Sequence, residues 1–171
     1  MLYRNLRREC QQIVNQLDLP RPFSVEALCD QLAEQRKRPL HLMPLPPEAG
    51  AIGACGLWLS TSTSDFIFVE RNTSLPHQEH IVLHEIGHML FDHRTLSMAE
   101  PASMSEIFSD LGPDLLRRYL ARTNYGTRHE QEAEMLASLI RTTADDATPE
   151  QPVSVLGKLE AAMGVGERHA R

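Results

Sequence analysis

The residues with the clearest chemical potential are His84, Glu85 and His88, which form the pattern HExxH. Residues four apart on an α-helix lie about 40° apart around its axis, so the two imidazoles would share one face. Two imidazoles placed in this way can bind one zinc ion through ring nitrogens. Glu85 is offset by one position, from which its carboxylate can reach a water molecule beside the ion. The pattern therefore indicates a zinc site with a general base next to it.

The HExxH pattern falls within a segment that we predict to be one helix, from about Pro76 to Asp92. The other positions around the pattern are apolar: Val82, Leu83, Ile86, Met89 and Leu90. Burying three polar groups without partners in such a helix is costly, so a shared ligand would explain them. The alternative is a partly exposed face on which these groups are merely solvated. Gly87 costs about 1 kcal/mol relative to alanine inside a helix, which indicates that another element approaches closely there.

The third ligand is less obvious, because a catalytic zinc ion usually has three protein ligands and one open position. A histidine six residues after His88 would give the metzincin pattern, but that position is Arg94. His80 is expected to be an exposed histidine near the start of the helix. The remaining candidates are carboxylates on a later helix, predicted from Thr127 to about Thr142.

One face of this later helix combines two carboxylates with small and apolar side chains: Glu130, Ala133, Glu134, Ala137 and Ile140. The alanines would let the helix press closely on another one. Glu130 could be the third ligand, with Glu134 one turn further accepting a hydrogen bond from a ligand histidine. Equally, Thr127 to Glu130 is a capping box, in which Glu130 would bond to the backbone instead. Glu132 is expected to point away from this face.

The remaining elements predict an α+β fold with N-terminal helices, a small and mainly antiparallel sheet of about three strands, and a helical half that carries both ligand-bearing helices. Residues 1–142 are expected to form a single domain, and 143–171 a C-terminal linker, short helix and frayed tail. The helices expected outside the site are 2–17, one capped by Ser24, 101–111, 114–122 and 153–163; the strands are 39–45, 56–60 and 65–70.

Composition excludes several classes of protein. The 171 residues suit one domain, and 23 acidic against 17 basic residues give a net charge of −6, which argues against direct nucleic-acid binding. The run Arg36-Lys37-Arg38 is expected to be a solvated helix end. Apolar runs are far shorter than the roughly 20 residues of a membrane span, so no membrane association is expected. The 3 cysteines form no CxxC pair, which suits reduced thiols in a cytoplasmic protein.

An HExxH helix after a small sheet, followed by Glu-x-x-Ala-x-x-x-Ala on a later helix, resembles the ImmA/IrrE family of metallopeptidases, which is related to the gluzincins. The similarity covers about residues 24–140, with specific motifs at 83–90 and 130–140. The chain departs from the family in the later helix. It has Glu134 where Asn or Asp is usual, Leu136 where an aromatic residue often occurs, and no Leu-Leu-x-Pro ending.

The resemblance implies one zinc ion per chain, with the ligands His84, His88 and Glu130 and with Glu85 as the catalytic base. It implies a cytoplasmic endopeptidase of regulatory type that hydrolyses a peptide bond in a specific partner protein, such as a helix-turn-helix transcriptional regulator. Residues that could stabilise the oxyanion or contact the substrate, none of them singled out by spacing, are Tyr119, Tyr125, Arg128 and His129.

Two other functions are compatible with the same residues. The first is a metal-containing but non-catalytic regulatory or toxin–antitoxin-type protein that acts by binding a partner. The second is a structural zinc site, which normally has four protein ligands and would need a fourth from His80, His93 or His129. A structural site gives no reason for a glutamate directly after the first histidine.

Overall fold

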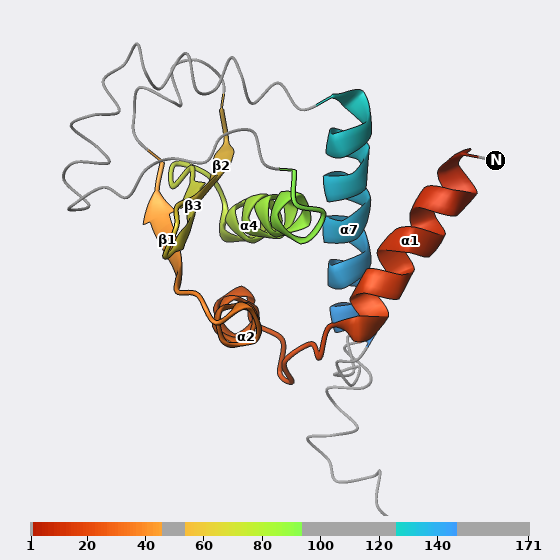
Figure 1. Ribbon diagram of the computed structural model, residues 1–171, viewed down its shortest axis with the longest axis horizontal. Coiled ribbons are helices and arrows are strands. Elements are labelled where there is room, and N and C mark those ends of the chain that lie inside the picture. The colour runs from red at the N-terminus through yellow and green to blue at the C-terminus, as the bar shows by residue number, and fades with distance from the viewer. Residues whose placement is uncertain (1, 46–53, 94–125, 147–171) are drawn as a thin grey trace, which may run out of the picture.

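The computed structural model describes residues 2–45, 54–93 and 126–146 of the chain. Figure 1 shows helix α4 lying between the sheet on one side and helix α7 on the other, with α1 against the outer side of α7. This arrangement confirms the predicted α+β fold of N-terminal helices, a small three-stranded sheet and further helices. The elements in chain order are α1 (Leu2–Gln16), α2 (Val25–Arg36), β1 (Leu40–Pro44), β2 (Gly56–Ser60), β3 (Asp65–Val69), α4 (Leu75–Leu90) and α7 (Thr127–Asp146).

Local signals account for most helix boundaries. Ser24 caps α2, because its hydroxyl accepts a hydrogen bond from the backbone N–H of Ala27 at 3.0 Å. Pro76 lies in the first turn of α4, where a missing N–H costs nothing. Helix α7 continues past its expected end near Thr142, because Ala144 is still buried. The first residues of the expected linker are thus helical. The helices expected over 101–111, 114–122 and 153–163 lie outside the described residues.

The sheet is mixed, which corrects the expectation of a mainly antiparallel one. Its strand order is β1-β3-β2, with β3 antiparallel to β2 and parallel to β1. A hairpin joins β2 to β3, and the N–H of Thr61 donates to the carbonyl of Ser64 at 2.9 Å within it. Strand β1 pairs with the other edge of β3, in the parallel direction. Strand β2 remains an edge strand, beside α4.

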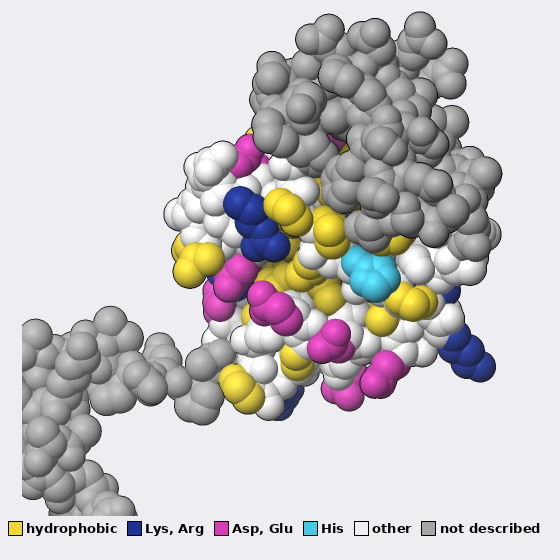
Figure 2. Space-filling model, turned by 90° about the vertical axis from the view of Figure 1, so that its left-hand side faces the viewer, with side chains coloured by type: hydrophobic (Ala, Val, Ile, Leu, Met, Phe, Trp, Pro, Cys, Tyr) yellow, Lys and Arg dark blue, Asp and Glu magenta, His cyan; other side chains and the backbone are white. Residues whose placement is uncertain are grey.

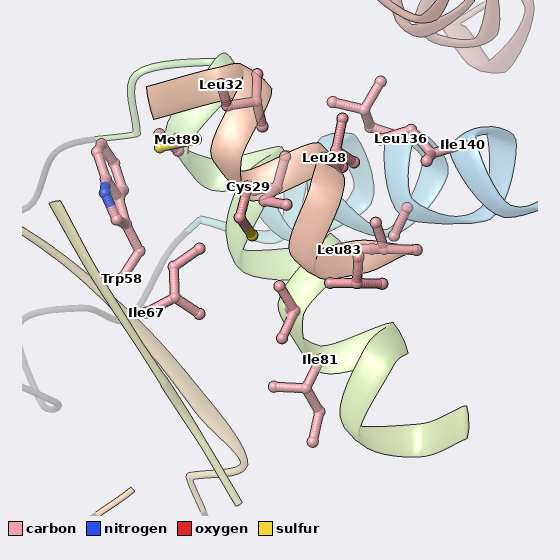
Figure 3. Packing of buried hydrophobic residues seen from close by; sticks show 14 of the residues in the cluster. Leu28, Cys29, Leu32, Trp58, Ile67, Ile81, Leu83, Met89, Leu136 and Ile140 are labelled. Atoms are coloured by element: carbon pink, nitrogen blue, oxygen red, sulfur yellow. The ribbon is translucent and has the colours of Figure 1, made fainter. Parts of the chain in front are cut away.

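The core lies where α2, α4, α7 and one face of the sheet meet (Figure 3). The sheet contributes Trp58 and Ile67, which point toward the helices. The labelled helical side chains, all buried, are Leu28, Cys29, Leu32, Ile81, Leu83, Met89, Leu136 and Ile140. Because these elements pack around α4, its two buried polar side chains, Glu85 and His88, lie in a setting that is costly for unpaired groups.

The basic run after α2 is not simply solvated, contrary to expectation. Asp65, whose side chain is 1% exposed, lies 3.3 Å from Nη2 of Arg36 and 3.5 Å from Nε of Arg38. The indole N–H of Trp58 donates to the same carboxylate at 3.3 Å. These contacts join α2 to the sheet at the N-terminal end of β3, and a buried carboxylate without them would be strongly destabilising.

The described surface matches the acidic composition of the chain. On the face drawn in Figure 2, hydrophobic side chains form a cluster with acidic side chains beside and below it, and basic side chains lie both next to the cluster and at the margins. None of the helices within residues 2–45, 54–93 and 126–146 combines the length and the apolar character that crossing a bilayer requires.

Candidate metal centre

Helices α4 and α7 touch backbone to backbone at Gly87. A Cβ atom placed on Gly87 would lie only 2.7 Å from Cα of Ala133, which is fully buried. This contact accounts for a glycine in the middle of a helix. It brings Glu130, about one turn before Ala133, against the face of α4 that carries His84 and His88.

Three side chains converge at this contact. Nε2 of His84 and Nε2 of His88 are 3.0 Å apart. Oε2 of Glu130 lies 3.4 Å from Nε2 of His84, and the other oxygen of the same carboxylate, Oε1, lies 3.5 Å from Nε2 of His88. Ligand atoms arranged tetrahedrally at about 2.0–2.1 Å from zinc lie about 3.3 Å from one another. The three groups could therefore hold one metal ion.

The protonation of His88 suits a ligand. Burial, together with the neighbouring imidazoles of His84, His93 and His129, lowers the pKa of His88 to about 3. The ring is therefore neutral at physiological pH, as a metal ligand must be. Since its side chain is only 1% exposed, no solvent competes for its nitrogens.

Glu134 lies where a partner of His84 is expected. Its Oε2 is 3.4 Å from Nδ1 of His84, the nitrogen that faces away from the other ligand atoms. The same oxygen is 3.1 Å from Nε2 of His80. His80 is thus not merely an exposed histidine near the helix start, because it shares the carboxylate that orients His84.

Glu85 is buried on the neighbouring side of α4. Burial, and then the negative charge of Glu130, raise the pKa of Glu85 to about 8, although a hydrogen bond from the backbone of Trp58 opposes the shift. Its Oε2 is buried and has no hydrogen-bond partner within the described residues. A carboxyl group with an unpaired oxygen and a pKa near neutrality is suited to taking up and releasing a proton.

The sequence did not reveal two residues that lie behind the ligands. Glu132 was expected to point away, yet its side chain is 7% exposed and its Oε2 is 2.9 Å from Nε2 of His93. His93 reaches this position because Asp92 adopts a left-handed conformation (φ 54°) that folds the chain back over the end of α4. Glycine at position 92 would have signalled such a turn, whereas aspartate does not.

The structure describes two of the four residues predicted to contact the substrate or the oxyanion, Arg128 and His129. Arg128 donates from Nε to Oε1 of Glu132 at 2.8 Å, and the ring of His129 stacks on that of His93 with 4.1 Å between centroids. Neither belongs to the group of three ligand atoms. Tyr119 and Tyr125 lie outside the described residues.

A groove of about 870 Å³ opens onto the candidate centre. It runs between α1 and α7, and the ligands His84 and Glu130 form part of its wall. Further lining residues include Tyr3, Leu6, Glu9 and Glu134. Among the described residues no fourth side chain joins the three ligands.

No family model matches the chain, and neither does any curated protein or solved structure. Any function assigned to the chain therefore depends on the chemistry of its own residues: a set of three ligand atoms, a buried carboxyl group and a groove that leads to them.

Proposed function

We propose that the chain is a zinc-dependent endopeptidase of the ImmA/IrrE type, with His84, His88 and Glu130 as metal ligands and Glu85 as general base. The observation that carries the proposal is the convergence of the three ligand atoms at separations that suit a tetrahedral zinc ion. Two imidazoles and a carboxylate are a donor set that zinc favours. Oε2 of Glu85, which has no hydrogen-bond partner among the residues that the structure describes, supports catalysis over a purely structural role.

The proposed mechanism assigns a proton transfer to Glu85. A zinc ion in this centre would supply Lewis-acid activation of a water molecule and of the scissile carbonyl. A nearby cation favours the ionised form of Glu85, which opposes the effect of burial on its pKa. Oε2 of Glu85 then accepts the proton of the attacking water and passes it to the leaving amine. The backbone of Trp58 holds the carboxyl group in place during both transfers.

The groove and the sheet edge support a peptide as the substrate. Residues of both α1 and α7 line the groove. Among the described strands, β2 lies at an edge of the sheet beside α4, where an extended peptide can add. By the resemblance, the substrate is a specific cytoplasmic regulator, such as a helix-turn-helix protein. Cleavage of a single partner also avoids the hazard of general proteolysis.

Native mass spectrometry of four proteins tests the centre: the wild type, His84→Ala, Glu130→Ala and Glu85→Gln. We expect one zinc ion per wild-type chain, little or none in the first two variants, and full occupancy in Glu85→Gln. Asp145→Asn, which removes an exposed charge from the same helix as Glu130, is the matched control. A wild type that binds no metal, or a Glu130→Ala variant that keeps it all, would contradict the proposal.

Glu85→Gln also separates catalysis from partner binding. If the chain is a peptidase, this variant keeps zinc and partner affinity but loses cleavage and the biological effect. If the effect survives in full, the alternative of a non-catalytic regulator that acts by binding a partner replaces the present proposal.

A further inference from the structure

A chain of polar contacts runs from His88, behind the candidate metal centre, through buried side chains to Arg128 at the surface. Nδ1 of His88 is 3.0 Å from Nδ1 of His93. Nε2 of His93 is 2.9 Å from Oε2 of Glu132, whose Oε1 accepts a hydrogen bond from Arg128 at 2.8 Å. The side chains of His88, His93 and Glu132 are all buried, at 1%, 5% and 7% exposure. The set of three ligands by itself gives no reason for this arrangement.

Hydrogen-bonding capacity gives the chain a single direction. Glu132 is paired with the guanidinium of Arg128, so its carboxylate only accepts, and Nε2 of His93 must donate to it. A neutral His93 then has only Nδ1 as an acceptor, and this is the atom that faces His88. Nδ1 of His88 is therefore the donor. Its Nε2 then keeps the lone pair, which makes it the acceptor in the 3.0 Å contact with Nε2 of His84. The same lone pair would face a metal ion held by the ligands.

We propose that His93 and Glu132 are positioning residues that hold His88 in the tautomer protonated on Nδ1 and so prepare its Nε2 for the metal ion. The inference rests on the proposed metal centre and deepens it. In this view one helix, α7, orients both ligand histidines from behind: Glu134 acts directly on His84, and Glu132 acts on His88 through His93. Removal of a residue that orients a ligand histidine in this way typically lowers metal affinity by 10- to 100-fold.

A second metal ion at His93, His129 and Glu132 is the competing interpretation, since these three groups also lie close together. The rings of His93 and His129 are stacked, with 4.1 Å between centroids and 20° between planes. Their in-plane lone pairs therefore run side by side and do not converge on one ion at about 2.0–2.1 Å. The guanidinium of Arg128 on the same carboxylate also repels a cation. The geometry favours the hydrogen-bonded chain.

The tautomer of His88 can be measured in the metal-free protein by ¹⁵N NMR of its imidazole at pH 7.5. We expect the proton on Nδ1 in the wild type. In Glu132→Gln the amide oxygen can keep the bond with Arg128, so the amide N–H₂ faces Nε2 of His93. This reverses the chain, makes His93 the donor to His88, and moves the proton of His88 to Nε2.

Zinc affinity, measured by competition with a chelator, is the second readout. We expect zinc affinity to fall 10- to 100-fold in Glu132→Gln and in His93→Phe, in which an aromatic ring without nitrogen atoms replaces the imidazole. His93→Asn, which restores an acceptor near the place of Nδ1, should bind zinc within about threefold of the wild type, as should the control Asp145→Asn.

The outcomes separate this inference from the proposed function. A wild type that binds zinc, but whose metal-free His88 carries its proton on Nε2, overturns the positioning role alone. Unchanged zinc affinity in both Glu132→Gln and His93→Phe would also overturn the positioning role alone. So would a second zinc ion per chain that is lost in His129→Phe. A wild type that binds no zinc overturns both proposals. If a variant does not fold, the wild-type tautomer still decides the question.

Discussion

A Cβ atom on Gly56 would lie 2.6 Å from Oε1 of Glu85, so the carboxyl group occupies space that any larger residue at this position would fill. The same atom would lie 2.6 Å from Cγ2 of Ile81 on α4. Because the backbone of Trp58 also bonds to Glu85, the start of β2 confines this carboxyl group. The sheet thus positions the proposed base, whereas α7 supplies the carboxylate ligand.

Gly56→Ala should therefore impair catalysis without removing the metal. The new methyl group would displace the carboxyl group of Glu85, and a misplacement of about 1 Å can cost about 100-fold in rate. The atoms nearest to the new methyl group belong to Glu85 and Ile81, and neither residue is one of the three ligands. We expect kcat/KM for the cleaved partner to fall by one to two orders of magnitude, with one zinc ion per chain by native mass spectrometry. Gly126→Ala, whose Cβ would meet nothing within 4 Å, is the control. Loss of zinc from Gly56→Ala would argue against this division of roles.

Gly87→Ala should remove both the metal and stability. By helix propensity alone, alanine would stabilise α4 by about 1 kcal/mol. However, its Cβ would lie 2.7 Å from Cα and 2.9 Å from the carbonyl oxygen of Ala133, and backbone atoms do not yield cheaply. Helix α7 must move, and Glu130 moves with it. We expect a lower Tm and a zinc affinity reduced at least tenfold, measured by thermal unfolding and chelator competition. A rise in Tm with zinc affinity unchanged would show that the two helices are not in contact at Gly87.

The chemistry of the candidate centre could be read from local patterns. HExxH places its three polar groups by helical periodicity alone, and Gly87 signals the close approach that the structure shows at Ala133. Glu130 and Glu134 followed from the same periodicity on the later helix, although spacing could not decide between a ligand and a cap. Residues on one regular element are fixed relative to one another by its geometry, and this is why their spacing is informative.

Relationships between elements could not be read in this way. The parallel pairing of β1 with β3 depends on which edge of the β2–β3 hairpin the strand β1 joins, and no local pattern specifies that edge. Glu132 was misplaced because α7 is buried on a second side, against a segment that reaches it only through the left-handed turn at Asp92. Arg36 and Arg38 look like surface charges until the fold brings Asp65 beside them. In each case the deciding partner is distant in the sequence.

The pH dependence of stability should reveal Glu85 in the metal-free protein. Burial raises the pKa of Glu85 from 4.5 to about 8, so between these values the folded protein keeps a proton that the unfolded chain has lost. The free energy of unfolding therefore falls as pH rises through this range. The lowered pKa of His88 acts in the opposite direction but only below pH 6.5, where the unfolded chain takes up the proton. Above pH 6.5 the effect of Glu85 is no longer offset by that of His88.

We expect the metal-free wild type to lose on the order of 2 kcal/mol of stability between pH 6.5 and 8, since each pH unit is worth about 1.4 kcal/mol per proton. Urea unfolding in the presence of a chelator, at several pH values in this range, measures the loss. Glu85→Gln, which cannot ionise, should lack it. Because the other titrating groups are the same in both proteins, the difference between their pH dependences of stability is due to Glu85. Equal slopes of unfolding free energy against pH would show that Glu85 is already ionised when no metal is bound.

The turn after α4 gives a prediction that links helix capping to the metal centre. The N–H groups of Asp92 and His93 fold back onto the carbonyls of Met89, at 3.2 Å, and His88, at 2.9 Å, in the manner of a Schellman motif. Asp92 must adopt a left-handed conformation (φ 54°) for this, which glycine does without steric cost. Asp92→Gly should therefore raise stability by about 0.5–1 kcal/mol and leave zinc affinity unchanged, because His93 keeps its place beside His88.

Asp92→Val should lower both stability and zinc affinity, since a β-branched residue resists this conformation and would move His93 away from His88. Urea unfolding and chelator competition on the two variants measure both effects. If both variants weaken zinc binding equally, the carboxylate of Asp92, and not the turn it forms, matters to the centre.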